Sequence, residues 1–287
     1  MVVGHRCERE HGQTRWLLRF VACSVSLVAT AAQEVVQVMS GAQMRVLAAA
    51  MDADADGLVS REEAAKVVRS IRVGQSWQQS APIMDSMDTN KDGSLSLDEL
   101  KQDLRHFKID DARKEEYAHS FSSFDDDGDG LLSSEEALPL FNFMFPFQNL
   151  DTSPHDGKLN LKEFKAIAAP KLAGAAAEEV RRSNEEAKTH FAALDADGDR
   201  RLNAKEHFHY ASGLYASLAA LDTLFRLADT NADASLSANE LVEVRGHAQF
   251  GGGAAYHHSK DWIEHIERAV EHVARTDTKG STPKSEL

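Results

Sequence analysis

Six short stretches of this chain repeat one arrangement of oxygen-bearing side chains. In the clearest stretch, aspartate fills the first, third and fifth positions, glycine the sixth and glutamate the twelfth, as Asp52, Asp54, Asp56, Gly57 and Glu63. A hard cation such as Ca²⁺ takes about 6–8 oxygen ligands at roughly 2.3–2.6 Å, and a tight loop turns alternate side chains inward to supply them. The arrangement therefore predicts loops that wrap around a divalent cation.

The spacing is that of the EF-hand loop, and three stretches match it in full: loop 1 (residues 52–63), loop 2 (88–99) and loop 3 (125–136). Positions 1, 3, 5 and 12 of such a loop give side-chain oxygens, and position 7 gives its backbone carbonyl. Solvated turns are the alternative, because Asp, Asn and Gly also form ordinary turns. Three complete matches, each with an aliphatic residue at position 8, favour calcium binding. The predicted ligands are Asp52, Asp54, Asp56, Leu58, Glu63, Asp88, Asn90, Asp92, Ser94, Glu99, Asp125, Asp127, Asp129, Leu131 and Glu136.

Two further stretches, loop 5 (residues 195–206) and loop 6 (229–240), carry every side-chain oxygen but lack glycine at position 6. Arg200 and Ala234 stand there instead, and a Cβ at positive φ costs roughly 1–2 kcal/mol. We therefore expect both loops to bind calcium more weakly than loops 1 to 3. Their predicted ligands are Asp195, Asp197, Asp199, Arg201, Glu206, Asp229, Asn231, Asp233, Ser235 and Glu240.

Loop 4 (residues 151–163) is irregular, because its closing Glu163 falls at the thirteenth position counted from Asp151. One residue in the 153–155 stretch is effectively an insertion. Asp151, Asp156, Asn160 and Glu163 could still converge on an ion. The alternative is that loop 4 serves only as a pairing partner for its neighbour.

The flanking apolar periodicity predicts an all-α fold of six helix–loop–helix units in three pairs, with short β contacts between paired loops. The simplest pairing joins neighbours in the sequence. Residues 33–110 would then hold loops 1 and 2, residues 111–172 loops 3 and 4, and residues 178–250 loops 5 and 6. Residues 251–287 would form a glycine linker, a C-terminal helix and a tail.

The connector between loops 3 and 4 has only fourteen residues and two prolines, so two full helices do not fit there. It also holds a dense aromatic cluster, Phe141-Asn142-Phe143-Met144-Phe145-Pro146-Phe147. Such a cluster can form an adhesive surface for a partner. We favour the alternative, that its rings fill the core of the pair of loops 3 and 4.

The C-terminal helix carries an apolar stripe at helical spacing, formed by Trp262, Ile266, Ala269 or Val270, and Val273. It could bind a helix of another protein. We favour docking on the last loop pair.

Both ends of the chain resemble sorting signals of the secretory pathway. Residues 1–32 contain four arginines before an uncharged run that ends in small residues, which is typical of a signal peptide. An uncleaved anchor and a buried helix are the alternatives, although the run is too short to cross a bilayer as a helix. The final Lys284-Ser285-Glu286-Leu287 differs by one residue from an endoplasmic-reticulum retrieval signal. We expect retention in that lumen, with secretion as the competing fate.

Composition limits the partners of the chain and the disulfides that it can form. The chain has 46 acidic against 32 basic residues and a net charge of −14, which argues against nucleic acid as a partner. Both cysteines, Cys7 and Cys23, lie in the predicted signal peptide. Without that segment the chain could form no disulfide, and its stability would depend on helix packing and bound metal.

A signal peptide, six EF-hand loops and a retrieval-like tail together resemble the calumenin and reticulocalbin family. The resemblance covers residues 33–287 and rests on the order and number of these features. It implies low-affinity calcium binding in the lumen and the regulation of client proteins there or in the membrane.

Two functions remain open from the sequence. The first is a lumenal calcium buffer or chaperone-like regulator, and the second is a switch-type sensor that opens an apolar groove onto a target. Enzymatic activity finds no support, because the chain shows no nucleophile elbow, no Gly-rich phosphate loop and no His-Glu-x-x-His array.

Overall fold

The computed structural model describes residues 39–106, 109–145, 147–152, 155–167 and 172–280, with side chains described up to residue 271. The predicted signal peptide (residues 1–32) and the retrieval-like tail (284–287) lie outside the described residues. The side chain of Val273, in the predicted apolar stripe, lies outside the described side chains.

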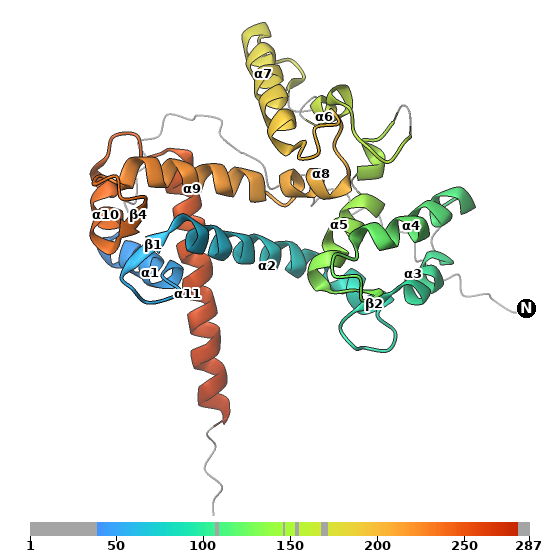
Figure 1. Cartoon of the computed structure of the whole chain (residues 1–287), viewed down its shortest axis with the longest axis horizontal. Helices are drawn as coiled ribbons and strands as arrows, with labels where there is room; N and C mark the ends of the chain where they lie inside the picture. The colour runs from blue at the N-terminus through green and yellow to red at the C-terminus, as the bar shows by residue number, and fades with distance from the viewer. Residues whose placement is uncertain (1–38, 107–108, 146, 153–154, 168–171, 281–287) are drawn as a thin grey trace, which may run out of the picture. The chain divides into compact units, whose positions relative to one another are not determined.

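The described chain is mostly helical, as predicted. Its helices are α1 (Gly41–Met51), α2 (Arg61–Met87), α3 (Leu97–Leu104), α4 (Asp111–Phe124), α5 (Ser134–Met144), α6 (Leu161–Ala166), α7 (Ala177–Leu194), α8 (Ala204–Ala211), α9 (Leu214–Ala228), α10 (Ala238–Glu243) and α11 (Ala254–Gly280), with 3-10 turns η2 (Phe147–Asn149) and η4 (Val244–Gly246). Short strands β1 (Leu58–Ser60), β2 (Leu95–Ser96), β3 (Leu131–Leu132) and β4 (Ser235–Ser237) lie between the helices (Figure 1).

The residue at position 9 of a loop also starts the helix that follows. Ser96, Ser133 and Ser237 are N-caps whose side chains accept the backbone N–H of the glutamate at position 12, and that glutamate returns a hydrogen bond to the cap. Asn160 and Asn203 cap α6 and α8 in the same way. This reciprocal capping box satisfies two N–H groups at the helix start. The position-12 glutamate therefore closes the loop and begins the helix at once.

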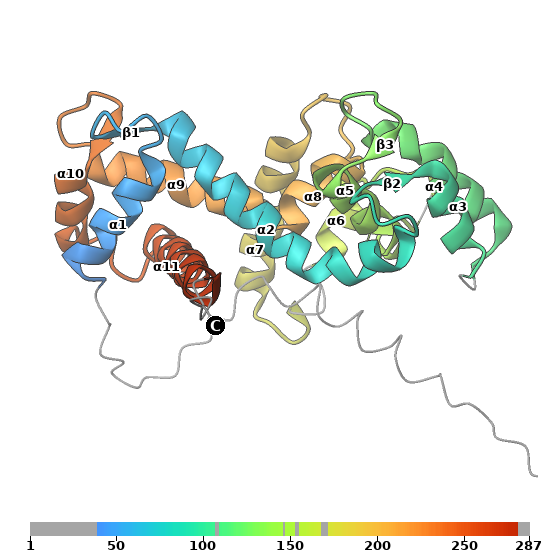
Figure 2. The ribbon, with the colours of Figure 1, turned by 90° about the horizontal axis from the view of Figure 1, so that it is seen from below.

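The predicted pairing of neighbouring loops is wrong. Strand β1 of loop 1 pairs with β4 of loop 6, and β2 of loop 2 pairs with β3 of loop 3, both antiparallel (Figure 2). An isolated bridge joins Leu159 of loop 4 to Leu202 of loop 5. The pairs are thus 1 with 6, 2 with 3, and 4 with 5.

The connectors explain this outcome. The residues between loops 1 and 2 form one continuous helix, α2, which runs through Pro82 without a turn that could fold loop 2 back onto loop 1. In the described part of the connector, loops 3 and 4 are separated by α5 and the 3-10 turn η2, which confirms that two full helices do not fit there. Helices α8 and α9 follow each other between loops 5 and 6, separated only by residues 212 and 213.

The described chain divides into two compact units. Unit 1 runs from Val73 to Gly213, and unit 2 combines residues 39–72 with residues from Leu214 onward. Unit 2 therefore holds loops 1 and 6, and unit 1 holds loops 2 to 5.

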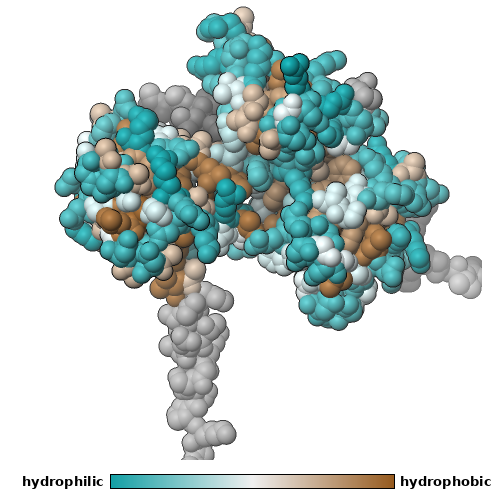
Figure 3. All heavy atoms as spheres, in the orientation of Figure 1, coloured by the Kyte–Doolittle hydropathy of each residue, from teal (hydrophilic) through white to brown (hydrophobic). Residues whose placement is uncertain are grey.

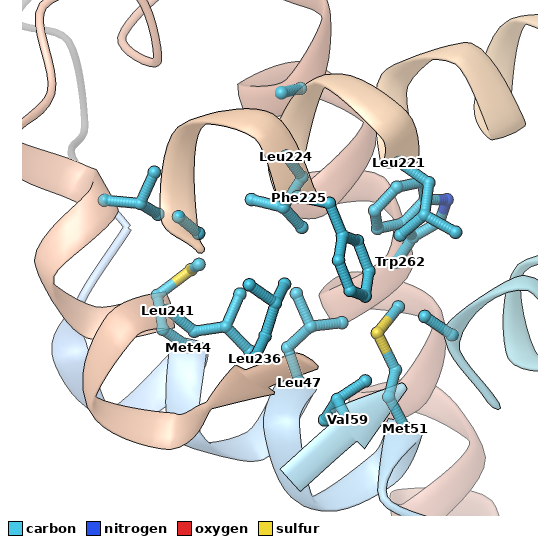
Figure 4. Close-up of a cluster of buried hydrophobic side chains, with 14 of the residues drawn as sticks. Met44, Leu47, Met51, Val59, Leu221, Leu224, Phe225, Leu236, Leu241 and Trp262 are labelled. Carbon is cyan, nitrogen blue, oxygen red and sulfur yellow. The ribbon is translucent and has the colours of Figure 1, made fainter. Parts of the chain in front are cut away.

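The core of unit 2 joins segments from both ends of the chain. Met44, Leu47 and Met51 of α1 face Leu224 and Phe225 of α9, with Val59, Leu236, Leu241 and Trp262 completing the cluster (Figure 4). Helix α11 packs against both α1 and α9. It docks on the pair of loops 1 and 6, and not on a pair of loops 5 and 6 as predicted.

The apolar stripe on α11 is shorter than predicted. Trp262 and Ile263 are fully buried and Ile266 packs partly against the core, whereas Ala269 is exposed and Val270 is 64% exposed. Within residues 254–271, only the part of the helix up to Ile266 therefore contributes to the core of unit 2.

A buried arginine joins three helices of unit 2. Arg72 donates from Nε to Ser217 Oγ at 2.6 Å, and its Nη2 lies 3.1 Å from Asp261 Oδ2 and 3.1 Å from His258 Nδ1. Because buried charges are costly unless paired, this network fixes α11 in one register against α2 and α9.

The core of unit 1 contains the aromatic cluster. Phe141, Phe143 and Phe147 are buried, and the ring of Phe143 lies 5.6 Å from Tyr117 and 5.5 Å from Phe147. His207 of α8 meets Asn142 of α5 at 3.1 Å between Nδ1 and Nδ2. These rings form core and not an exposed surface, as the favoured alternative predicted. The pair of loops 3 and 4 that it assumed does not form, because loop 3 pairs with loop 2 and loop 4 with loop 5.

The view of the surface in Figure 3 shows mostly hydrophilic residues with scattered hydrophobic ones. Large hydrophobic residues are exposed only at Val46, Leu58 and Val270 within the described chain. None of the described helices combines the length and apolarity that a bilayer crossing requires.

Candidate metal centres

All six loops fold around the carboxylate at position 1. In loop 1, Gly57 at position 6 donates its backbone N–H to Asp52 Oδ2 at 3.0 Å. The corresponding bond measures 2.8–3.1 Å in the other five loops, with the N–H coming from Gly93, Gly130, Gly157, Arg200 and Ala234. One oxygen of each position-1 aspartate is thus fixed by the backbone. The other, Oδ1, also accepts a backbone N–H in loops 1 to 3. It has no hydrogen-bond partner among the described residues in loops 4 to 6.

Positions 3 and 5 are held by the same kind of bond. The position-5 N–H donates to the side-chain oxygen at position 3, as from Asp56 to Asp54 Oδ1 at 3.1 Å, and loops 2, 3, 5 and 6 repeat this contact. The position-7 N–H donates in turn to Oδ1 at position 5, from Leu58 to Asp56 at 2.8 Å and likewise in all six loops. Backbone N–H groups therefore hold the side-chain oxygens at positions 3 and 5 in place. The role of the position-7 carbonyls (Leu58, Ser94, Leu131, Arg201 and Ser235) stays a prediction.

The position-12 glutamate ties the two ends of each loop together. In loop 1, Glu63 Oε1 accepts the N–H of Ala53 at 3.0 Å, and Oε2 accepts the N–H of Ser60 at 2.9 Å. The Ser60 hydroxyl and these N–H groups lower the pKa of Glu63 to about 2. Burial works to raise the pKa of Glu99, but its hydrogen bonds outweigh burial and lower that pKa to about 2 as well. Both groups stay ionised, as a calcium ligand must be.

Position 6 takes positive φ in all six loops, as expected, and weaker calcium binding by loops 5 and 6 stays a prediction. Glycine fills this position at φ of 74° to 88° in loops 1 to 4, whereas Arg200 has φ 66° and Ala234 φ 67°. Position 4 also takes positive φ, which the sequence analysis missed. Gly128 and Gly198 occupy it in loops 3 and 5, but Ala55, Lys91 and Ala232 occupy it at φ near 60° in loops 1, 2 and 6.

Loop 4 recovers the common geometry after its extra residue. Gly157 donates to Asp151 Oδ2 at 2.8 Å, one residue further along than in the other loops, and Lys158 donates to Asp156 Oδ1 at 3.1 Å. Glu163 accepts from Thr152 at 2.9 Å and from Asn160 at 2.9 Å. Asp151, Asp156, Asn160 and Glu163 therefore take the places of positions 1, 5, 9 and 12. The residues at 153 and 154, within the stretch predicted to hold the insertion, lie outside the described chain.

The structure brings carboxylates together as the sequence predicted. Ligand atoms lie within 4.8 Å of one another in three groups: Asp52, Asp54 and Asp56; Asp125, Asp127 and Glu136; Asp195, Asp197 and Asp199. In loops 2 and 6 an asparagine stands at position 3, and its Nδ2 donates to the position-5 aspartate at 2.8 Å.

Buried carboxylate oxygens without a hydrogen-bond partner indicate that a cation fits three of these loops. Asp151, Asp195 and Asp229 each bury Oδ1 with no hydrogen-bond partner in the part of the chain that the structure describes. An unpaired buried carboxylate oxygen is unfavourable unless a cation or a donor reaches it. Burial also raises the pKa of Asp151. Each orphaned oxygen belongs to the aspartate at position 1, whose carboxylate is a calcium ligand in an EF-hand loop.

Comparison with known proteins agrees with the loop geometry. A family model described as EF hand matches residues 81–104 and 118–136, which include loops 2 and 3. Calmodulin-like protein 9 of Arabidopsis thaliana is 28% identical over 86 residues, which is 30% of this chain and 57% of that relative. Calmodulin-like protein 2 of the same plant is 24% identical over 127 residues, which is 40% of this chain and 84% of that relative.

A solved structure, a homolog of programmed cell death 6 protein from Leishmania major Friedlin, covers 59% of this chain and 93% of its own at 16% identity. Its TM-score is 0.23, too low to support an argument about the fold. The family match, the curated relatives and the oxygen-lined loops lead to one conclusion. This chain is a calcium-binding protein of the EF-hand type.

Proposed function

We propose that this protein is a low-affinity calcium buffer or chaperone-like regulator of the secretory-pathway lumen, with all six loops acting as EF-hand sites in three pairs. The observation that carries the proposal is the common hydrogen-bond scheme of the six loops, in which a backbone N–H at position 6 fixes one oxygen of the position-1 aspartate. A chain with many sites and a net charge of −14 suits storage of calcium.

Burial of the apolar faces supports a buffer over a switch-type sensor. The aromatic cluster lies in the core of unit 1, and α11 covers the pair of loops 1 and 6 in unit 2. A sensor needs an apolar groove that opens when calcium binds. We propose that the chain lacks catalytic activity, since its chemistry-bearing motifs are calcium loops.

Calcium titration with an apolar-surface dye tests this function. We expect half-saturation at roughly 10⁻⁴–10⁻³ M, typical of modules that face calcium-rich compartments, with several ions bound per chain and little added dye binding. Glu63→Gln should reduce the number of ions bound by about one, because the bidentate ligand of loop 1 is lost. Glu62→Gln, which changes the exposed neighbouring residue, should not. A micromolar midpoint with a large rise in dye fluorescence would show that the sensor is correct.

Location requires a separate test. We propose that residues 1–32 direct the chain into the lumen and that residues 284–287 retain it there. A chain without residues 284–287 should then accumulate in the culture medium, while the full chain should stay with a lumenal marker. A full chain that remains in the cytosol would contradict the proposed compartment.

A further inference from the structure

The side chains at position 7 set the pair of loops 4 and 5 apart from the other pairs. Both are cationic, Lys158 and Arg201, whereas loops 1, 2, 3 and 6 have Leu58, Ser94, Leu131 and Ser235 there. Position 7 immediately precedes the bridging residue, Leu159 or Leu202, at which the two loops pair. Each cationic residue is therefore adjacent in sequence to the residue that contacts the partner loop.

The two cations reach the partner loop reciprocally. Lys158 Nζ forms an ion pair with Asp199 at position 5 of loop 5, and lies 3.9 Å from Oδ2 of Asp197 at position 3. Arg201 Nη1 forms an ion pair with Asp156, which takes the place of position 5 in loop 4. The four side chains of these two pairs are only 31–39% exposed.

These contacts use oxygens that calcium would need. Oδ1 of Asp199 accepts the N–H of Arg201, the bond seen at position 5 of every loop, so Lys158 takes the second oxygen. In Asp156, Oδ1 accepts the N–H of Lys158 and Oδ2 binds Arg201. The Lys158 ammonium also lowers the pKa of Asp199. A divalent cation entering either loop meets a side-chain positive charge already at the carboxylate, and like charges repel.

The carboxylates at position 1 take no part in either ion pair. Oδ1 of Asp151 and Oδ1 of Asp195, the carboxylates at position 1, have no hydrogen-bond partner within the described residues. The cationic side chains therefore neutralise only position 5, and they leave the deeper ligand for a metal ion.

We propose that Lys158 and Arg201 are built-in competitors of calcium in the pair of loops 4 and 5. They neutralise the position-5 carboxylate of the partner loop, hold the pair together without an ion, and move aside when calcium binds. This inference rests on the proposed calcium-storing function and assigns its weakest sites to this pair. Loops 4 and 5 should fill last.

Calcium titration of the full chain against a chromophoric chelator tests the competition. We expect Lys158→Gln and Arg201→Gln each to tighten the weakest binding step about threefold, and the double variant about tenfold, which matches partly exposed ion pairs. The controls are Lys162→Gln and Arg105→Gln. They remove the same charge from exposed positions of unit 1 with no ion pair among the described residues, and should change affinity less than twofold.

Two measurements assign the effect to this pair. In a Glu163→Gln/Glu206→Gln background the gain should disappear, because both loops lose their position-12 ligand. In chelator, the bridging amides of Leu159 and Leu202, bonded at 2.8 and 2.9 Å, should exchange with solvent faster in the double variant than in the controls.

Equal affinities in the variants and the controls would overturn the competition, and unchanged exchange at the bridge would overturn the holding role. Failure of the proposed function looks different. The parent chain would then take up no millimolar calcium at loops 1 to 3, whereas the exchange experiment in chelator would still report on the two ion pairs.

Discussion

The two units cover the apolar faces of their loop pairs in different ways. In unit 2 a single pair, loops 1 and 6, is covered by the long helix α11, which brings Trp262 and Ile263 into the core. In unit 1 two pairs cover each other, with α5 after loop 3 packed on α8 after loop 5. There, Asn142 and Phe147 meet the buried His207.

The difference shows what a pair of calcium loops lacks by itself. Its helices bury one face against each other and leave another apolar face to be covered, and a small unit cannot leave that face in water. A second pair covers it in unit 1. A helix from the other end of the sequence covers it in unit 2, and its polar contacts with Arg72 set the register.

The largest effect should come from removing the cover of unit 2. Trp262 is fully buried among α1, α9 and α11, so Trp262→Ala should lower the free energy of unfolding of unit 2 by about 3–5 kcal/mol. Peptide-resolved hydrogen exchange should then show faster exchange in α1 and α9 but unchanged exchange in α5 and α8.

Trp262→Phe is the matched control. The indole Nε1 is buried with no hydrogen-bond partner in the described chain, so phenylalanine removes an unsatisfied donor while it keeps most of the apolar volume. This variant should remain close to the parent in stability. Equal loosening of both units by Trp262→Ala would contradict the separate covers.

A smaller effect should come from relieving backbone strain, once in each unit. Ala234→Gly in unit 2 and Arg200→Gly in unit 1 remove a Cβ at positive φ, which costs about 1–2 kcal/mol, and glycine returns part of that gain as chain entropy. We expect a net gain of about 1 kcal/mol in unfolding free energy and a few-fold tighter calcium binding, measured by denaturant unfolding and calorimetry. Ala219→Gly, at an exposed helical position of α9, should instead lose about 1 kcal/mol.

The loops and their flanking helices could be predicted because their determinants are local. The ligand spacing and the capping box both lie within twelve or thirteen residues, and the structure repeats them in every loop. Pairing could not be predicted. Each contact strand has at most three residues, and position 8 is aliphatic in all six loops, so the sequence carries no preference for one partner. The connectors decide it.

The parts of the site that escaped prediction depend on that pairing or on backbone shape. Lys158 and Arg201 have no visible role until loops 4 and 5 are known to lie together. Positive φ at position 4 is masked by Ala55, Lys91 and Ala232, since none of these residues signals a left-handed conformation. Loop 4 could be read only as two alternatives, because an insertion shifts the count while the Gly157 bond restores it.

The smallest effect should come from acid acting on the polar network beneath α11. His258 Nδ1 faces a guanidinium of Arg72, which can only donate, and the hydroxyl of Ser217, so the unprotonated nitrogen fits this place. Burial, then the charges of Arg72 and His257, lower the pKa of His258, although Asp261 opposes them. As pH falls, His258 is therefore protonated in the unfolded chain at a higher pH than in the folded chain. The stability that His258 contributes is present above pH 6.5, the ordinary histidine pKa, and is lost as pH falls from there through the lowered value.

Unfolding of unit 2 followed from pH 7.5 to pH 5.5 should show this loss in the parent chain and in the exposed neighbour variant His257→Gln, but less of it in His258→Gln. An identical pH slope in His258→Gln and the parent would mean that this histidine does not couple α11 to acid.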